Sequence, residues 1–253
     1  MLVAAPARAA EPLHVLAAFT LKPVLDAIAQ DYGAKGGEVT LVYRPSPGLA
    51  QQIENGAPGD LFFSADPMWT EQLMKHGLIK PGTVTNLVGN QLVLIAGKGR
   101  APPVLNTREL PRLIGAGPVA MCDPDSHPTG RMAKASLTSL GLWDDIAPKV
   151  ARAENPLLAV TMVARGDAPY AIVFTTDAMT DPGVDIVMTF PDDSHPPIRY
   201  PVAILAKSTN PDATVFLDRL KFPAATALFK RFGYVTLGAQ DERSSADQRV
   251  DER

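Results

Sequence analysis

Short apolar runs alternate with segments of helical periodicity along the first third of the chain. The first run, Leu13–Phe19, is almost continuously apolar, and Val39–Tyr43 and Leu61–Ser64 are the next two. After the first run, apolar residues recur every three or four positions at Leu21, Leu25, Ile28 and Tyr32. A buried parallel strand followed by an amphipathic helix gives this pattern. The pattern therefore predicts an α/β fold with right-handed crossovers.

Two later apolar runs, Leu87–Ala96 and Ile198–Ala206, are unusually long for single strands. Between them lies a second strand-and-helix set, with predicted elements at Val119–Cys122, Thr129–Leu140, Pro156–Ala164, Tyr170–Phe174 and Val184–Thr189. Two helices, Pro211–Leu220 and Ala224–Phe232, follow the second long run. We interpret the long runs as strands that cross between two lobes. Residues 13–90 with 199–237 would form lobe 1 and residues 91–198 lobe 2, with a ligand expected between them at the carboxyl ends of strands.

Composition narrows the class of protein. The 253 residues are 46% hydrophobic and 20% charged, which is usual for a globular chain. The formal net charge of −3 lacks the basic surplus of nucleic-acid-binding proteins, so we expect no nucleic-acid partner. A single cysteine, Cys122, excludes an intramolecular disulfide and a zinc site built from several cysteines.

The two ends of the chain differ from the rest. Residues 1–12 contain the small residues that precede a signal-peptide cleavage site, so we interpret them as a signal-peptide remnant or a disordered segment. Residues 238–253 are charged and aperiodic, which predicts a disordered tail. The signal-like segment favours an exported, periplasmic protein.

Hydroxyl residues follow three of the predicted strands. These are Thr20 in AAFTLKP, Ser46 in YRPSPGL and Thr129 in DPDSHPTGR. The first amides of a helix have no intrahelical partners and lie at the positive end of the helix dipole, so such junctions suit a small anion. Each of these residues could equally be an ordinary helix N-cap.

Four segments together resemble the periplasmic molybdate-binding proteins of ABC importers. They are AAFTLKPVLDAIAQDY, YRPSPGLAQQIENGAPGDLFFSADPMW, GDAPYAIVFTTDA and FPDDSHPPIRYPVAIL, and the resemblance extends over about residues 13–236. It implies a two-lobed type II periplasmic binding protein fold, with two parallel or mixed sheets joined by two crossover strands. It also implies a non-catalytic monomer without cofactors that binds molybdate or tungstate and delivers it to an inner-membrane permease.

The resemblance also implies ligand-binding positions. Thr20 and Ser46 match family serines that donate to the oxyanion, and Thr129 matches a position that gives its backbone amide. Pro156 falls on another amide-donating position and Phe174 on a tyrosine whose hydroxyl reaches the anion. Proline has no N–H and phenylalanine no hydroxyl, so two expected donors are missing, unless Leu157 or Asn155 supplies the amide.

Two arginines, Arg44 and Arg131, lie beside these segments. They are either solvated or ion-paired side chains, or replacements for the missing donors, since guanidinium binds oxyanions and carboxylates bidentately. In the second case the ligand would be a phosphonate, sulfate or small carboxylate. A non-transport anion sensor with the same fold is a further alternative.

Other polar residues give no pattern of an enzyme or metal site. The spacing of His127 with Asp123 or Asp125 matches no zinc motif and is typical of a polar loop. Cys122 ends an apolar strand, which favours a buried thiol over a Cys–His nucleophile. We therefore predict a binding protein with no enzymatic activity and no side-chain metal site.

Overall fold

The computed structural model describes residues 11–100 and 106–237, so the predictions for residues 1–10 and 238–253 lie outside the described residues. The chain divides into two compact units. The first consists of the described parts of Met1–Val88, Arg199–Phe229 and Thr236–Arg253, and the second of those of Gly89–Ile198 and Lys230–Val235.

The first unit is built on a six-stranded mixed sheet. Its strands, in sheet order, are β11 (Val235–Thr236), β4 (Thr85–Gly89), β10 (Arg199–Ile204), β3 (Leu61–Phe63), β1 (Leu13–Ala18) and β2 (Val39–Arg44). Strand β1 is parallel to β2 and β3, and β10 is antiparallel to β3.

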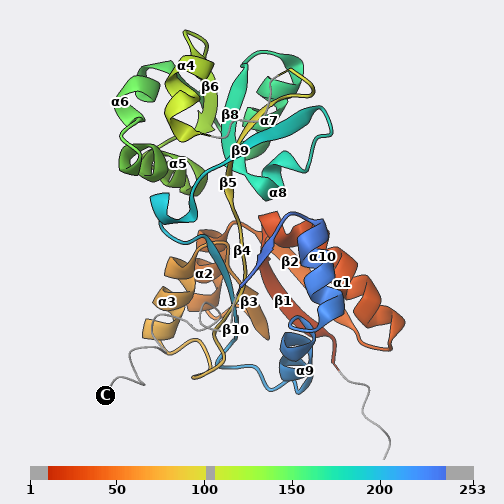
Figure 1. The fold of residues 1–253 in the computed structure, drawn as a ribbon. Helices are drawn as coiled ribbons and strands as arrows, with labels where there is room; N and C mark the ends of the chain where they lie inside the picture. Colours follow the sequence, from red (N-terminus) through yellow and green to blue (C-terminus); the bar gives the residue numbers. More distant parts are fainter. Residues whose placement is uncertain (1–10, 101–105, 238–253) are drawn as a thin grey trace, which may run out of the picture. The chain divides into compact units, whose positions relative to one another are not determined.

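Helices cover both faces of this sheet (Figure 1). One face carries α2 (Ser46–Glu54) and α3 (Pro67–Lys75), and the other carries α1 (Lys22–Ala34), α9 (Asp212–Arg219) and α10 (Pro223–Arg231). A short 3-10 segment, η1 (Phe19–Leu21), joins β1 to α1. Because successive side chains of a strand alternate between faces, Leu16 and Phe62 pack against Leu49, Ile53 and Leu73 of α2 and α3.

The second unit contains a five-stranded mixed sheet. Its strands, in sheet order, are β7 (Val150–Ala153), β6 (Val119–Cys122), β8 (Tyr170–Phe174), β5 (Leu92–Gly97) and β9 (Val184–Thr189). Strand β6 is parallel to β7 and β8, whereas β5 is antiparallel to β8 and β9.

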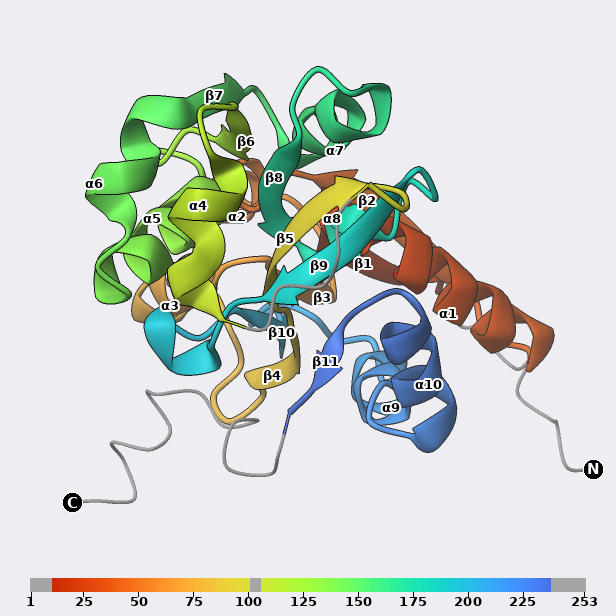
Figure 2. The same ribbon diagram turned by 45° about the horizontal axis from the view of Figure 1, so that its top comes forward.

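The helices of the second unit also form two layers (Figure 2). One layer holds α4 (Leu110–Ile114), α5 (Pro128–Ser139) and α6 (Trp143–Ile146), and the other α7 (Pro156–Arg165) and α8 (Thr175–Ala178). Three 3-10 segments complete the unit: η2 (Thr107–Glu109), η3 (Ala147–Lys149) and η4 (Asp192–Ser194).

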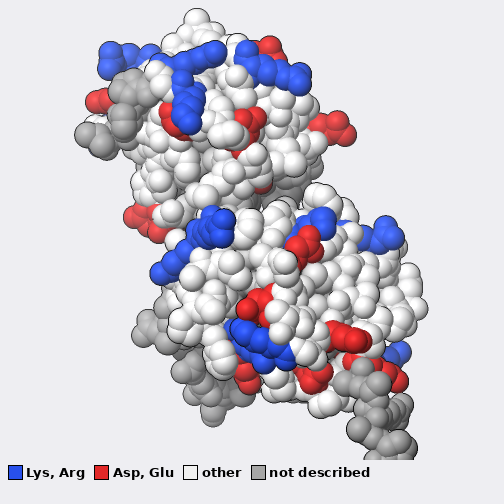
Figure 3. All heavy atoms as spheres, turned by 90° about the vertical axis from the view of Figure 1, so that its right-hand side faces the viewer, with Lys and Arg blue, Asp and Glu red and all other residues white. Residues whose placement is uncertain are grey.

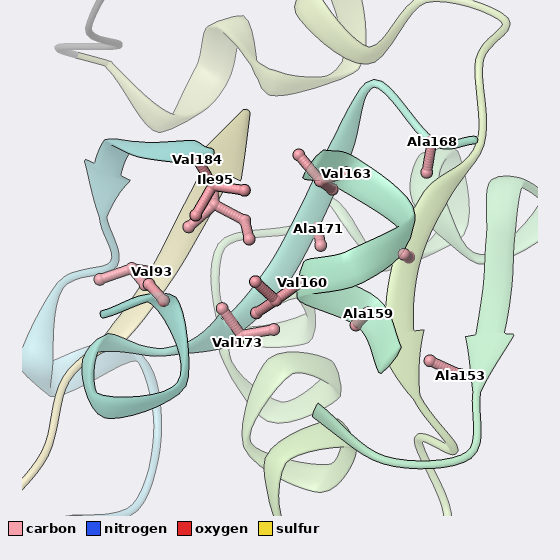
Figure 4. Packing of buried hydrophobic residues seen from close by; sticks show 12 residues of the cluster. Val93, Ile95, Ala153, Ala159, Val160, Val163, Ala168, Ala171, Val173 and Val184 are labelled. Atoms are coloured by element: carbon pink, nitrogen blue, oxygen red, sulfur yellow. The ribbon is translucent and has the colours of Figure 1, made fainter. Parts of the chain in front are cut away.

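Small and β-branched residues hold α7 against the second sheet. Val160 and Val163 of this helix pack on strand residues Val93, Ile95 and Val173 (Figure 4). All five side chains are buried, which removes apolar surface from water on both the helix and the sheet. This packing fixes the N-terminus of α7 beside the carboxyl ends of the neighbouring strands.

The α/β prediction with two mixed sheets is confirmed, but the first long run is not one strand. Strand β4 ends at Gly89 and β5 begins at Leu92. Between them, the side chain of Asn90 accepts a hydrogen bond from the amide of Gln91 at 3.0 Å. The second long run forms a strand only over Arg199–Ile204.

Candidate anion-binding residues

Thr20 lies in η1, directly after β1, and is exposed. The N-cap of α1 is Leu21, with no side-chain capping bond, so Thr20 is not an ordinary cap of that helix. The nearby Lys22 is held by Asp26 at 2.6 Å and lies 4.8 Å from the centre of the Tyr43 ring. Its charge is therefore compensated within its own helix, and Thr20 is an exposed hydroxyl residue at this junction.

Tyr43 and Lys22 share the same carboxylate. The Tyr43 hydroxyl donates to Asp26 at 2.7 Å. Burial and then Asp26 raise the pKa of Tyr43, so the phenol stays protonated. Burial opposes ionisation of Asp26, but the hydrogen bonds from Lys22 and Tyr43 lower its pKa. The Asp26 carboxylate next to this junction is thus ionised and accepts hydrogen bonds from both Lys22 and Tyr43.

Ser46 is the first residue of α2 and is only 6% exposed. The N-cap of α2 is Pro45, so the capping alternative is wrong for Ser46 as well. The Oγ of Ser46 accepts a hydrogen bond from the amide of Ala65 at 3.0 Å. A hydroxyl that accepts one hydrogen bond still has its proton to donate, so Ser46 is a hydrogen-bond donor whose oxygen is fixed in position.

The structure brings Thr20 and Ser46 to one edge of the first sheet. Strands β1 and β2 are parallel neighbours in register, with Ala18 opposite Arg44 at their carboxyl ends. Thr20 and Ser46 each lie two residues beyond that register pair. The expected juxtaposition of these two residues therefore follows from strand pairing within one unit.

Thr129 is the second residue of α5 and is 2% exposed. Its amide donates to Nδ1 of His127, the N-cap residue, at 3.3 Å. The next residue must be glycine, because a Cβ on Gly130 would lie 2.2 Å from the carbonyl oxygen of Asp123. This close approach holds the first turn of α5 against the end of β6.

Pro156 is the first residue of α7, a position where proline is favoured because the helix needs no N–H there. It can donate no hydrogen bond. The side chain of Asn155 caps the helix by accepting from the amide of Leu158 at 2.9 Å. The intervening amide of Leu157 donates to no group within residues 11–100 and 106–237, which makes it the available donor at this helix end.

Phe174 ends β8 and is 9% exposed, and its amide donates to Oδ2 of Asp177 at 3.1 Å. Hydroxyl residues follow it directly. The Oγ1 of Thr176 accepts from the side-chain amide of Asn90 at 2.9 Å, so its proton remains available, as at Ser46. Sequence reasoning missed Thr176, although it shows the same pattern of a hydroxyl just after a strand.

Strand pairing also groups the positions of the second unit. Cys122 and Ala153 are register partners at the carboxyl ends of the parallel strands β6 and β7, and β8 is parallel to β6. Thr129, Pro156 and Phe174 therefore lie at or after the carboxyl ends of three neighbouring strands. A hollow after the carboxyl ends of β6 and β7 is lined by Asp123, Ser126, His127, Pro128, Arg152, Ala153 and Glu154.

Two buried titratable groups of the second unit, the carboxyl of Asp177 and the thiol of Cys122, have raised pKa values. Burial raises the pKa of the Asp177 carboxyl to about 7, against the hydrogen bond from the Phe174 amide. Burial and then the Asp177 charge raise the pKa of the Cys122 thiol to about 12. The thiol of Cys122 is fully buried, as predicted, and carries almost no thiolate near neutral pH.

The two arginines are placed differently. Arg44 ends β2 and is exposed. Arg131 lies in α5 and is half-buried, and its amide donates to the carbonyl oxygen of His127 at 2.8 Å. On the face drawn in Figure 3, Lys and Arg are interspersed with Asp and Glu and with wide neutral areas. That face does not have the basic patch of a nucleic-acid-binding surface.

Two mixed β-sheets flanked by helices, with hydrogen-bond donors after the ends of their strands, are typical of the type II periplasmic binding proteins. The chain belongs to the family described as bacterial extracellular solute-binding protein, which it matches over residues 13–235. Among the described residues, no helix is long and apolar enough to cross a membrane.

Several of the similar proteins are named molybdate-binding proteins. The chain is 38% identical over 226 residues to the molybdate-binding protein ModA of Escherichia coli, covering 88% of each chain. It is 35% identical over 233 residues to ModA of Haemophilus influenzae, covering 89% of this chain and 91% of that one. The solved periplasmic molybdate-binding protein of Azotobacter vinelandii has a TM-score of 0.70 at 27% identity, covering 89% of this chain and 100% of that chain.

Proposed function

We propose that this protein captures molybdate or tungstate outside the cytoplasm and delivers it to the membrane permease of an ABC importer. The observation that carries the proposal is the buried hydroxyl of Ser46, which is held by the Ala65 amide and keeps a proton to donate. The names of the relatives supply the ligand class.

The chemistry of the ligand fits these donors. A tetrahedral dianion accepts hydrogen bonds on all four oxygens and donates none. Helix N-termini and hydroxyls supply donors with partial positive charge and avoid the desolvation of a buried cation. We propose that Thr20 and Ser46 of the first unit and the Thr129 amide of the second each donate to the anion.

The two departures from the family pattern have substitutes in the second unit. The amide of Leu157 is available one residue beyond Pro156, and the Thr176 hydroxyl two residues beyond Phe174. We propose these groups as the remaining donors. Each hydrogen bond to a charged ligand contributes about 1.5–3 kcal/mol, so both substitutes matter for affinity.

A second ligand class has one observation in its favour. Arg131 is half-buried in the second unit, on the same helix turn as the Thr129 junction. If its guanidinium bound the ligand, phosphonate, sulfate or a small carboxylate would be preferred. In either case the protein would act as a monomer, without a cofactor or a catalytic step.

A titration with a panel of anions tests the proposal. Purified protein is titrated with molybdate, tungstate, sulfate, phosphate and a phosphonate by calorimetry, and its thermal unfolding is followed with each. We expect tight binding of molybdate and tungstate and weak or no binding of the others. Preference for sulfate, phosphate or the phosphonate would favour the arginine-based alternative, and no binding of any anion would refute both.

A further inference from the structure

His127 is held rigidly by the loop that precedes α5. The Asp123 carboxylate accepts from the amides of Asp125 and Ser126, both at 2.9 Å, and from the Ser126 hydroxyl at 2.9 Å. These bonds come first among the causes that lower the pKa of Asp123. The amide of His127 donates to the Asp123 carbonyl oxygen at 3.1 Å. These bonds restrict the backbone of His127 and therefore the position from which its imidazole extends.

The half-buried imidazole of His127 accepts a hydrogen bond from the Thr129 amide, the same donor that the proposed function assigns to the anion. Its Nδ1 accepts from the Thr129 amide at 3.3 Å, which is long for such a bond. Thr129 cannot readily shift its amide to reach a second acceptor, because Gly130 already lies against the carbonyl oxygens of Cys122 and Asp123. An anion and the imidazole thus compete for one donor.

We propose that His127 is a positioning residue that weakens and tunes oxyanion binding by capping the Thr129 amide until the ligand takes it. The inference rests on the proposed function. Binding then exchanges an intramolecular hydrogen bond for one to the ligand. A weak, long cap makes that exchange easy while still stabilising α5 in the free protein.

Protonation of His127 would release the same amide, because imidazolium has no acceptor nitrogen. The charged groups that face the ring are Arg131 on α5, Asp123 in the loop, and Arg152 and Glu154 across the hollow. Arg152 is ion-paired with Asp123. Burial and then Arg131 lower the pKa of His127, so the ring is neutral near pH 7 and acts as the cap. Anion affinity should therefore rise as the pH falls.

Three variants separate this role from a merely structural one. His127→Ala removes the cap, so molybdate should bind about three- to tenfold tighter at pH 7, the change expected from losing one competing hydrogen bond. The free protein should unfold at a lower temperature. His127→Asn keeps a side-chain cap that does not titrate, so it should bind about as the wild type does at pH 7. The control is Asn106→Ala. The Asn106 side chain caps η2 by accepting from the Arg108 amide at 3.0 Å, and its loss should leave the affinity for molybdate unchanged.

The readout is calorimetric titration with molybdate between about pH 5 and about pH 8, a range that extends well below the ordinary pKa of histidine because the pKa of His127 is lowered. The wild type should bind more tightly at the lower pH, and both His127 variants should show a flatter profile. Wild-type binding with unchanged affinity in His127→Ala, or with parallel pH profiles, overturns the inference alone. Absence of molybdate binding by the wild type overturns the proposed function and this inference with it.

Discussion

The amide of Ala65 donates to the Oγ of Ser46 at 3.0 Å, which ties the loop after β3 to the first turn of α2. The two residues lie 19 positions apart in the sequence, and the bond orients the hydroxyl of a residue that is only 6% exposed. Orientation before binding lowers the entropic cost of recognising a ligand.

Replacing Ser46 by alanine should therefore weaken molybdate binding strongly. One hydrogen bond to a charged ligand is worth about 1.5–3 kcal/mol, so the Kd should rise at least about tenfold. Ser208→Ala is the matched control, because Ser208 is also a buried serine of the first unit and donates to Asp60 at 2.6 Å. Both variants should lose stability, but only Ser46→Ala should lose affinity in calorimetry. Equal Kd values for the two variants would contradict the role of Ser46.

Restoring the hydroxyl at position 174 should tighten binding. Phe174→Tyr adds a donor at the end of β8, where the family pattern has a tyrosine, and should lower the Kd for molybdate about tenfold. Phe222→Tyr adds a hydroxyl to an exposed side chain of the first unit and should not change the Kd. If Phe174→Tyr binds no more tightly than the wild type, then the residue does not face the ligand.

Gly130 should tolerate no side chain. A Cβ there would lie 2.2 Å from the Asp123 carbonyl oxygen and 2.5 Å from that of Cys122, and backbone atoms cannot rotate away. Gly130→Ala should therefore lower the free energy of unfolding by at least about 2 kcal/mol, measured by urea titration. Gly33→Ala in α1 meets no atom within 4 Å and should raise it by about 0.5–1 kcal/mol. A neutral Gly130→Ala would show that the first turn of α5 is not pressed against β6.

The buried carboxyl of Asp177 should make stability fall as the pH rises. Burial raises its pKa to about 7 in the folded protein, from an ordinary value of 3.8. Between these two values the unfolded state has lost the proton and the folded state retains it, so the folded state binds more protons. Stability contributed by this group is therefore lost between about pH 4 and about pH 7, with a slope of at most about 1.4 kcal/mol per pH unit.

Asp177→Asn removes that titration and isolates its contribution. The variant should show a flatter dependence of unfolding free energy on pH over this range, measured by chemical denaturation. Its advantage over the wild type should be largest above pH 7, where the wild-type carboxylate is ionised. Parallel profiles for the two proteins would mean that Asp177 does not titrate in this window.

The fold could be predicted from the sequence where burial is strong and local. The apolar run of β1 and the helical spacing of α1 identified both elements, because one is buried on both sides and the other on one face. Strand β7 was missed, since it lies at the edge of its sheet and only Ala153 of its four residues is buried. The break after β4 was missed because it interrupts an otherwise apolar run.

The candidate site was predicted only in part. Hydroxyls after strands pointed to Thr20 and Ser46, because parallel pairing brings strand ends together. The cap that His127 places on Thr129 could not be predicted, since it depends on a loop conformation set by Asp123. A histidine two residues before a donor gives no periodic signal, and its spacing from acids suggested only a polar loop.

The central claim is that neutral hydroxyl and amide donors, and not guanidinium groups, bind the oxyanion. Calorimetric titration of molybdate into the double variant Arg44→Ala/Arg131→Ala tests it most directly. The account predicts a Kd within about fivefold of the wild type, which corresponds to the roughly 1 kcal/mol of a solvated charge. A loss of binding of about a hundredfold or more, equivalent to about 2.8 kcal/mol, would assign the anion to an arginine and contradict the account.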